Sequence, residues 1–215
     1  YVTLSGTISD GATVTGLETY QLSVGSVTKF INVTSQSGLV NTYEVTIVRQ
    51  ASHDATITDI KPSVSTLNPK FSSEIGDYKI EVEGDVKNIS FDVTTASTDA
   101  VVIGDGVTEL FPGKNIITIT VIAEDGITQQ SVNIEVYKKT DINSFETDLE
   151  INVPIGNDYQ IDIKYNPENT DYKEMTYVPQ DTSILSVSKD GLITPNKVGD
   201  TTIKVTSTRN PALTK

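Results

Sequence analysis

Residues 117–121 read Ile-Thr-Ile-Thr-Val, and residues 132–136 read Val-Asn-Ile-Glu-Val, with Asp125-Gly126 between them. Apolar and polar side chains alternate in both runs, so each run has one apolar face, as a half-buried β-strand does. An Asp-Gly pair between two such runs indicates a tight hairpin, because it supplies residues that tolerate positive φ. This stretch therefore predicts two antiparallel strands with one face turned inward.

The same alternation extends over most of the chain, and no long stretch repeats at helical spacing. Further runs with period two are Tyr78–Val82, Ile89–Val93, Leu149–Val153 and Tyr159–Ile163. Further Asp-Gly turn signals are Asp10-Gly11, Asp105-Gly106 and Asp190-Gly191. Short strands with frequent turns predict an all-β chain of tandem immunoglobulin-like antiparallel β-sandwiches.

An internal repeat links the first and second parts of the chain. Residues 12–38 align without a gap to residues 100–126, so that Gly16 matches Gly104 and Ile31 matches Ile119. Because the aligned positions are turns and inward-facing residues, the two segments are copies of one module.

The repeat and two short polar joints predict three domains, at residues 1–50, 51–139 and 140–215. The first has only the second half of the module, which leaves an apolar face and a sheet edge open. We expect that face to be completed by residues before Tyr1 or by another segment or chain. The joints, at 49–54 and 138–141, are short and poor in glycine, so restricted domain angles are expected.

Composition excludes several classes of protein. The net charge of −13 argues against nucleic acid and anionic lipid as partners. The chain has no cysteine, which excludes disulfides, thiolate zinc sites and cysteine nucleophiles. The chain contains no run of about 18 apolar residues, so no membrane-spanning segment is predicted.

Residues 54–138 resemble the bacterial cadherin-like β-sandwich domain of Gram-positive surface proteins. The resemblance rests on these motifs: Leu67-Asn68-Pro69-Lys70-Phe71, Tyr78–Val82, Leu110-Phe111-Pro112-Gly113 with Asn115, and Ala123–Gly126. Residues 1–50 are similar to the second half of the same domain.

Residues 140–215 resemble the group 2 bacterial immunoglobulin-like domain. Its motifs are Tyr165–Asn169, Met175–Tyr177, Ile184–Val187, Asp190–Thr194 and Gly199–Val205. Tyr177 stands where the family commonly has tryptophan, a change that bears on packing. The final strand that the family has after Thr208 is expected to be missing.

The two resemblances imply an extracellular location, at the cell surface or secreted, and a non-catalytic spacer or adhesion role in a bacterial surface protein. Its partners would be neighbouring domains of a longer protein. Two alternatives remain open: a module that binds carbohydrate or a host protein, and an accessory segment of a secreted polysaccharide-degrading enzyme.

The residues themselves give no catalytic constellation. His53 is the only histidine and lies in a predicted joint, where no fold holds it as the base of a triad. Glu81, Glu83 and Asp85 occupy outward positions on a strand and its turn, which is typical of a solvated face rather than of paired catalytic carboxylates.

Calcium is the one cofactor that the sequence leaves open. Calcium needs six to eight oxygen ligands, usually from several converging carboxylates. Acidic residues gather near the joints, and the candidate ligands are Asp54, Asp59, Asp141 and Asp148. No segment has regular Asp-x-Asp loop spacing, so solvated loop charge is the simpler interpretation.

A sugar-binding platform would need an exposed flat ring. The chain has no tryptophan, and Tyr20, Phe145 and Tyr172 are the aromatic residues least clearly predicted to face inward. Such isolated aromatic residues are more often part of strand packing, so no ligand is predicted from them.

Overall fold

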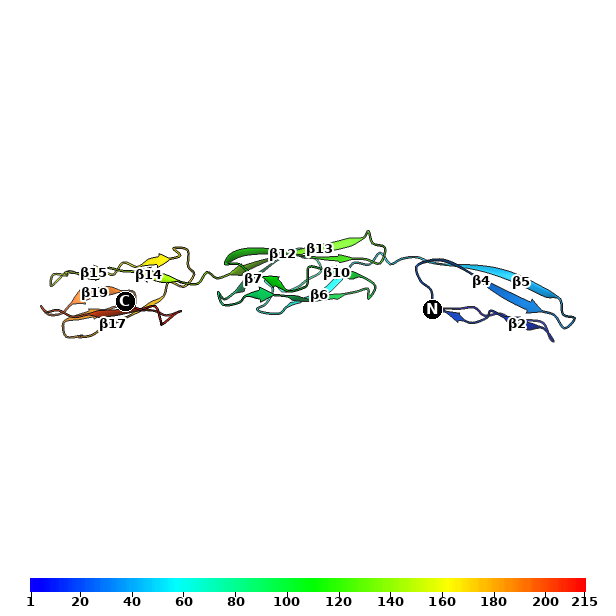
Figure 1. The fold of residues 1–215 in the computed structure, drawn as a ribbon, viewed down its shortest axis with the longest axis horizontal. Helices are drawn as coiled ribbons and strands as arrows, with labels where there is room; N and C mark the ends of the chain where they lie inside the picture. The colour runs from blue at the N-terminus through cyan, green and yellow to red at the C-terminus, as the bar shows by residue number, and fades with distance from the viewer. The chain divides into compact units, whose positions relative to one another are not determined.

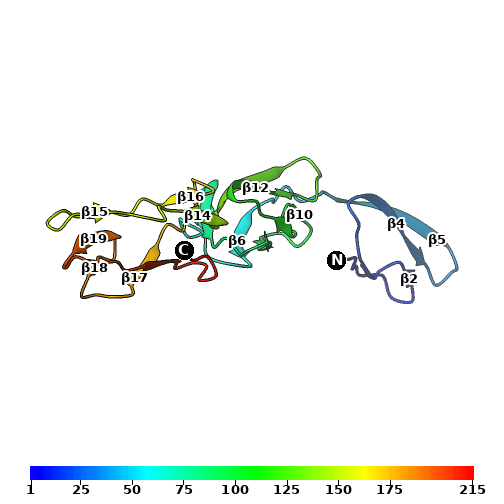
Figure 2. The ribbon, with the colours of Figure 1, turned by 60° about the vertical axis from the view of Figure 1, so that its left-hand side comes forward.

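The computed structural model describes residues 1–215, which form strands and turns with no helix (Figures 1 and 2). No helix is therefore present that could cross a membrane. Two compact units make up the chain. One contains residues 1–56, 95–101 and 121–130, and the other contains residues 57–94, 102–120 and 131–215. The predicted all-β fold class of immunoglobulin-like sandwiches is confirmed.

Residues 1–50 form a small antiparallel sheet. Its strand order is β2-β4-β5, with β2 at Thr13–Thr15, β4 at Gly25–Thr34 and β5 at Val40–Arg49. The β4–β5 hairpin is in register from Gly25 opposite Arg49 to Thr34 opposite Val40. A separate short pair joins β1, Val2–Thr3, to β3, Thr19–Tyr20. The long hairpin thus carries most of the strand pairing in this segment.

One face of this sheet is only half covered. No side chain among residues 1–50 is buried, and the alternate residues Val27, Val45 and Ile47 are partly exposed. Lys29 lies among them, with its Nζ 4.3 Å from the centre of the Tyr20 ring. A sheet with a single layer cannot remove its apolar face from water, so this part holds little core of its own.

The middle segment contains one four-stranded sheet and two separate pairs of strands. One sheet has the order β10-β12-β13-β7, and two smaller pairs are β6-β9 and β8-β11. The strands are β6 Ile57–Pro62, β7 Asp77–Val82, β8 Asn88–Ile89, β9 Phe91–Thr95, β10 Val101–Ile103, β11 Thr108–Glu109, β12 Gly113–Ile122 and β13 Gln129–Lys138. The β7–β13 pair is parallel, with Asp77 opposite Asn133 and Val82 opposite Lys138.

Alternate side chains of the middle segment are buried, as the period-two pattern predicts. Those with the least exposure are Ile57, Tyr78, Ile80, Ile89, Ile119, Val121, Val132, Ile134 and Val136. A fully buried aliphatic side chain of this size stabilises a fold by about 1.5–3 kcal/mol. The stability of the middle segment therefore comes from these alternate positions.

The internal repeat is visible in the backbone. Gly16 and Gly104 have φ values of 89° and 90°. A Cβ at Gly16 would lie 2.3 Å from the carbonyl oxygen of Phe30, and a Cβ at Gly104 would lie 2.2 Å from that of Thr118. Phe30 and Thr118 are also aligned in the repeat. Each copy thus requires glycine at this position for the same steric reason.

Residues 140–215 form a sandwich of short strands, all paired antiparallel. They are β14 Ser144–Glu146, β15 Tyr159–Gln160, β16 Lys164–Asn166, β17 Met175–Pro179, β18 Leu185–Val187, β19 Leu192–Pro195 and β20 Ile203–Ser207. Its core contains Ile142, Phe145, Met175 and Val205. Tyr177 packs against this core, and a Cβ at Gly191 would lie 2.8 Å from its ring. Tyrosine therefore keeps a packing role at the position where tryptophan is common.

Several expectations from the sequence are wrong. The predicted strand Tyr159–Ile163 is a strand only at Tyr159–Gln160. The alternating run Leu149–Val153 is not a strand. Period two gives such a segment an apolar face but supplies no partner for its backbone. Gly106 does not have positive φ, and in that turn Gly104 takes the left-handed conformation instead.

Candidate functional site: the two domain joints

The first joint is held by Arg49, the last residue of β5. Its Nη1 donates a hydrogen bond to Oε1 of Glu124 at 2.7 Å, and its Nη2 lies 3.5 Å from Oδ2 of Asp99. The backbone N–H of Ser52 donates to the other oxygen of Glu124 at 3.0 Å. The Arg49 bond is the largest cause of the lowered pKa of Glu124. One carboxylate therefore binds both the strand end and the connecting segment.

His53 is part of the same joint. Its Nδ1 lies 2.6 Å from Oδ2 of Asp125, while three quarters of its side chain remains exposed. Asp125 also accepts bonds from the Thr128 hydroxyl and from the N–H groups of Ile127 and Thr128. These bonds, the Thr128 hydroxyl first, hold the pKa of Asp125 well below its usual range. The contact between His53 and Asp125 therefore ties the connecting segment to the turn between β12 and β13.

The second joint is centred on Tyr172. Its hydroxyl donates to Oε2 of Glu83 at 2.5 Å and accepts from the N–H of Gly84 at 3.0 Å. The Arg209 guanidinium lies 4.4 Å from the centre of its ring, and the Lys139 Nζ lies 6.0 Å away. Burial and the bond to Glu83 raise the pKa of Tyr172. The Tyr172 side chain thus contacts residues of the middle segment as well as Arg209 of its own domain.

Arg209 binds two carboxylates while it covers this ring. Its Nε donates to Oδ1 of Asp141 at 2.9 Å, and its Nη2 donates to Oδ1 of Asp85 at 3.3 Å. A Cβ at Gly84 would lie 2.4 Å from Oδ2 of Asp141, so a larger residue there would displace the Asp141 carboxylate. The bond to Asp141 is the main cause of the raised pKa of Arg209.

The connecting residue itself is fixed. The N–H of Thr140 donates to Oδ2 of Asp171 at 2.7 Å, and its carbonyl oxygen accepts from the N–H of Asp171 and the hydroxyl of Thr170. Thr140 is 8% exposed. The Tyr137 hydroxyl donates to the same Asp171 carboxylate at 3.1 Å. Both polar backbone groups of the linker are therefore satisfied by one turn of the last domain.

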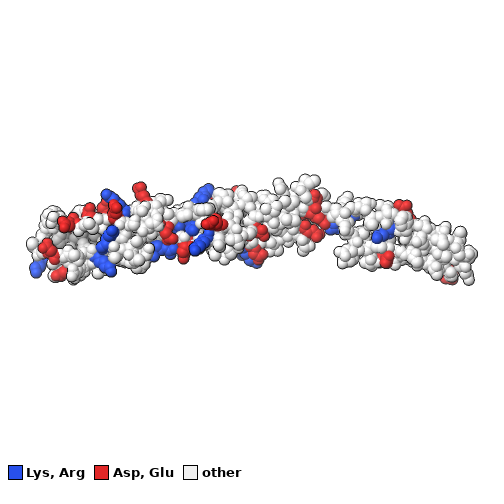
Figure 3. Space-filling view, in the orientation of Figure 1, with Lys and Arg blue, Asp and Glu red and all other residues white.

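The outward carboxylates of β7 and its turn pair with cations. Lys139 Nζ lies 3.2 Å from Glu81 and 2.8 Å from Glu83, and Asp85 binds Arg209. Glu83 and Glu81 are the first causes of the raised pKa of Lys139, and Lys139 is the first cause of the lowered pKa of Glu83. On the face shown in Figure 3, acidic side chains accordingly lie close to basic ones. These carboxylates belong to an ionic network at the joint.

The calcium candidates lie in separate environments. Asp54 accepts from the N–H of Thr56 at 2.9 Å, and Asp59 lies 3.1 Å from Nζ of Lys61. Asp148 accepts from the Tyr159 hydroxyl at 2.7 Å, and Asp141 binds Arg209. Nowhere do three or more histidine, aspartate or glutamate side chains converge as a metal site. The four candidate carboxylates are therefore not brought together around one position, as a calcium ion would need.

The aromatic candidates do not form a sugar-binding platform. Phe145 is 2% exposed and belongs to the core of the last domain. Tyr20 donates to the carbonyl oxygen of Gly16 and has Lys29 over its ring. Tyr172 is covered by Arg209. Sequence reasoning missed Arg49, Arg209 and Asp171, since no local motif marks a residue whose partners are far along the chain.

Two protein families match the chain. Residues 53–139 match the cadherin-like beta sandwich domain, and residues 141–215 match the bacterial Ig-like domain (group 2). Domains of these kinds are typically extracellular adhesion or structural modules and are generally non-catalytic, and no enzyme family is indicated.

Solved structures of cadherins are also similar. The protocadherin GammaB4 extracellular domain is 10% identical with a TM-score of 0.41, and the match covers 95% of this chain and 42% of that chain. Protocadherin gammaB3 EC1-4 is 8% identical with a TM-score of 0.41, covering 97% and 63%. Drosophila N-cadherin EC1-4 is 14% identical with a TM-score of 0.36, covering 93% and 57%. The chain thus spans less than two thirds of each of these structures.

No curated protein matches the sequence. The family matches meet around Thr140, where the second joint lies. Residues 53–139 therefore belong to the cadherin-like beta sandwich domain family, and residues 141–215 belong to the bacterial Ig-like domain (group 2) family.

Proposed function

We propose that the chain is a non-catalytic spacer and adhesion segment of a bacterial cell-surface protein, in which the second joint holds two successive domains at one angle. The observation that carries this proposal is the cluster of Tyr172, Arg209 and Asp171 around Thr140. A spacer transmits position only if its joints resist bending. A single connecting residue with both backbone groups bonded provides that resistance.

Each contact at the second joint contributes little free energy, but several such contacts act together. A partly exposed cation–π contact contributes about 0.5–1 kcal/mol, and an exposed ion pair contributes about 0.2–1 kcal/mol. The Arg209 guanidinium takes part in both kinds of contact at once. Its removal would also leave the Asp85 and Asp141 carboxylates close together without a cation. Arg209 is therefore the residue whose loss should loosen the joint most.

The test is a distance distribution between the two domains. Asp92→Cys and Lys189→Cys place one cysteine at an exposed position in each of the two domains. Because the chain has no other cysteine, spin labels attach only at these two positions and report the distance between them. Pulsed electron spin resonance should give a narrow distribution for the otherwise unchanged protein and a broader one for Arg209→Ala. Arg49→Ala, which removes the arginine of the first joint, is the matched control and should leave this distribution unchanged.

A broad distribution before any substitution at the joint would contradict the spacer proposal, as would equal widths with and without Arg209. The surface location needs its own measurement. Antibodies against the purified chain should label intact cells of the source bacterium without permeabilisation. Labelling that appears only after lysis would overturn that part of the proposal.

A further inference from the structure

The strand pair β7–β13 of the middle segment is parallel, whereas the strand pairs of residues 1–50 and 140–215 are antiparallel. Its register covers all six residues of β7. Backbone bonds continue past both ends of this register. The N–H of Asn133 donates to the carbonyl oxygen of Gly76 at 2.8 Å, and the N–H of Lys139 donates to that of Val82 at 3.0 Å. The two strands are therefore joined by an evenly spaced ladder along the full length of β7.

Side chains cross between the strands at both ends of this ladder. At its start, Nδ2 of Asn133 donates to Oδ1 of Asp77 at 3.3 Å. At its end, Nζ of Lys139 lies 2.8 Å from Oε1 of Glu83 and 3.2 Å from Oε1 of Glu81. These contacts hold the strand ends together, where a ladder would otherwise begin to fray.

The segment that leads into β7 is fastened to the same strand. Asn68 and Lys79 exchange two backbone hydrogen bonds of 2.8 Å. The Tyr78 hydroxyl donates to the carbonyl oxygen of Ser72 at 2.7 Å and accepts from its N–H at 3.2 Å. The ring of Phe71 stacks on that of Tyr78 with the centroids 5.9 Å apart. Contacts on both of its edges thus keep β7 in place beside β13.

A pull on the two connecting segments of the middle segment acts along β13. On the incoming side, the carbonyl oxygen of Ser52 accepts from the N–H of Asp125, in the turn that precedes β13. On the outgoing side, the chain leaves β13 at Lys138. Tension from the incoming side passes through β6 and residues 63–76 to the start of β7 at Asp77. Because β7 and β13 run in the same direction, the two pulls act at opposite ends of their ladder.

We propose that the β7–β13 pair is a mechanical clamp that carries tension through the middle domain. Strands pulled from opposite ends must slide past each other, so the bonds of the ladder are loaded together. Strands pulled apart from one end separate bond by bond, and a single backbone hydrogen bond is weak in water. The clamp deepens the proposed spacer role, since tension arises only in a chain that is held at both sides. Its resistance is a property of one domain and does not depend on the angle at the second joint.

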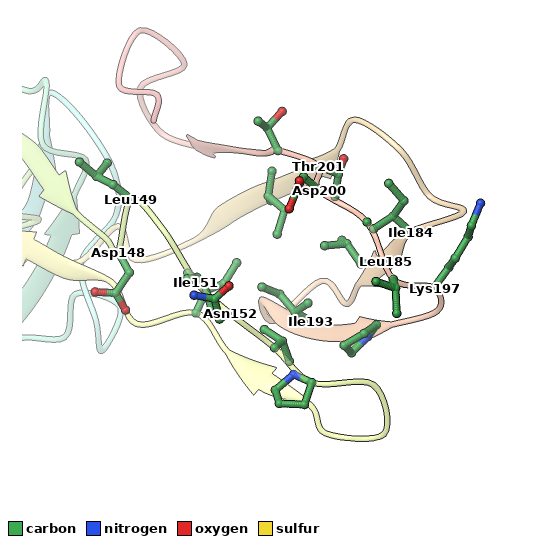
Figure 4. Close-up of a pocket in the computed structure, with 18 of the residues that line it drawn as sticks. Asp148, Leu149, Ile151, Asn152, Ile184, Leu185, Ile193, Lys197, Asp200 and Thr201 are labelled. Atoms are coloured by element: carbon green, nitrogen blue, oxygen red, sulfur yellow. The ribbon is translucent and has the colours of Figure 1, made fainter.

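The last domain has no corresponding pair. All of its strand pairs are antiparallel. Figure 4 shows Ile151, Ile184, Leu185 and Ile193 around one open space, a cavity of about 750 Å³. Side chains that face such a space have no packing partners across it and add little resistance to sliding. The clamp is therefore a feature of the middle domain.

Force spectroscopy on the purified full chain tests the proposal with two pairs of attachment points. Both pairs use Ser73→Cys, an exposed position just before β7. The shear pair adds Asn143→Cys, an exposed position after β13, and so loads opposite ends of the ladder. The peel pair adds Ser131→Cys, an exposed position near the start of β13, and so loads the same end. No other cysteine competes for the handles.

The unfolding force of the shear pair should be at least about twofold higher than that of the peel pair, because evenly spaced bonds share the load. Forced unfolding is governed by the barrier to unfolding. Both variants have the same fold, so a difference in force between them reports the direction of the pull. Equal forces, or a higher force for the peel pair, would overturn the proposal.

A substitution in the shear pair tests the side-chain contacts at the end of the ladder. Lys139→Met should lower the shear force, because it removes the cation between Glu81 and Glu83. Lys61→Met is the matched control and should leave the force unchanged, since its partner Asp59 lies on the same strand, β6. An unchanged force with Lys139→Met would overturn the role given to these contacts.

The clamp and the fixed joint fail in different measurements. A high shear force with a broad distance distribution between the domains would overturn the fixed joint and support the clamp. A narrow distribution with equal shear and peel forces would overturn the clamp and leave the joint.

Discussion

The two copies of the repeated module share their local geometry but differ in their burial. In both copies a glycine with φ near 90° sits against a carbonyl oxygen of the neighbouring strand. Ile119 in the second copy is fully buried, whereas its counterpart Ile31 in the first copy is only half-buried. Ile117 is 6% exposed, and its counterpart is Lys29. Local sequence therefore sets the hairpin, and the second layer of strands sets the core.

The largest expected effect is the loss of a core side chain in the second copy. Ile119→Ala should destabilise its domain by about 2–5 kcal/mol, because the cavity it leaves is closed on all sides. Ile31→Ala should cost about 1 kcal/mol, since water already reaches that face. Native-state hydrogen exchange on β12 and β4 would measure each value. Ile116→Ala, at an outward position of β12, is the control and should change stability by at most about 0.5 kcal/mol. Equal losses at Ile119 and Ile31 would remove the distinction between the copies.

The glycine position should respond alike in both copies. Gly104→Ala and Gly16→Ala each place a Cβ against a backbone oxygen in a left-handed conformation, so each should cost about 1–3 kcal/mol in its own module. Gly106→Ala is the control, because a Cβ there has no neighbour within 4 Å. Amide exchange of β2 and β10 is the measurement. A tolerated alanine at Gly104 would show that the strands separate easily at this point.

The smallest expected effect is a difference between the two hairpin turns in how their stability depends on pH. Asp125 in the second copy corresponds to Ser37 in the first. The lowered pKa of Asp125 means that the folded state favours the carboxylate, so its contribution to stability is complete above the ordinary aspartate pKa of about 3.9. That contribution is lost as the pH falls further towards the pKa in the folded state.

Acidification below about pH 4 should therefore weaken the β12–β13 turn and spare the β4–β5 turn, where serine hydroxyls bond to each other. Amide protection at Thr128 and Leu39, corrected for intrinsic exchange, would be compared at pH 6 and pH 3. Asp125→Asn should remove the difference in pH response between the turns. A parallel acid response of both turns would show that the carboxylate is not its source.

The period-two pattern was a reliable guide where a partner strand was present. It predicted the buried positions of β7, β12 and β13, because alternation along a strand is a property of the backbone itself. It failed at Leu149–Val153, because whether such a run becomes a strand depends on a neighbour that the run does not encode.

The sequence predicts where the joints lie, but it does not predict their chemistry. The matches to the two families meet around residue 140, within the second predicted joint, yet the pairing of Arg209 with Asp85 at that joint spans 124 positions. The pairing of His53 with Asp125 likewise joins residues far apart in the sequence, over 72 positions. Contacts of this kind depend on the folded arrangement of several strands, and no local spacing predicts them.

The bonded linker residue has a consequence for the durability of the chain. Proteases bind their substrates as extended segments, so a bond can be cut only if the residues around it can leave the protein surface. Thr140 has both backbone groups hydrogen-bonded and its side chain buried, and its release requires the Asp171 turn to open first. Connections between domains are usually where digestion begins, but this one should stay intact until the last domain itself begins to unfold.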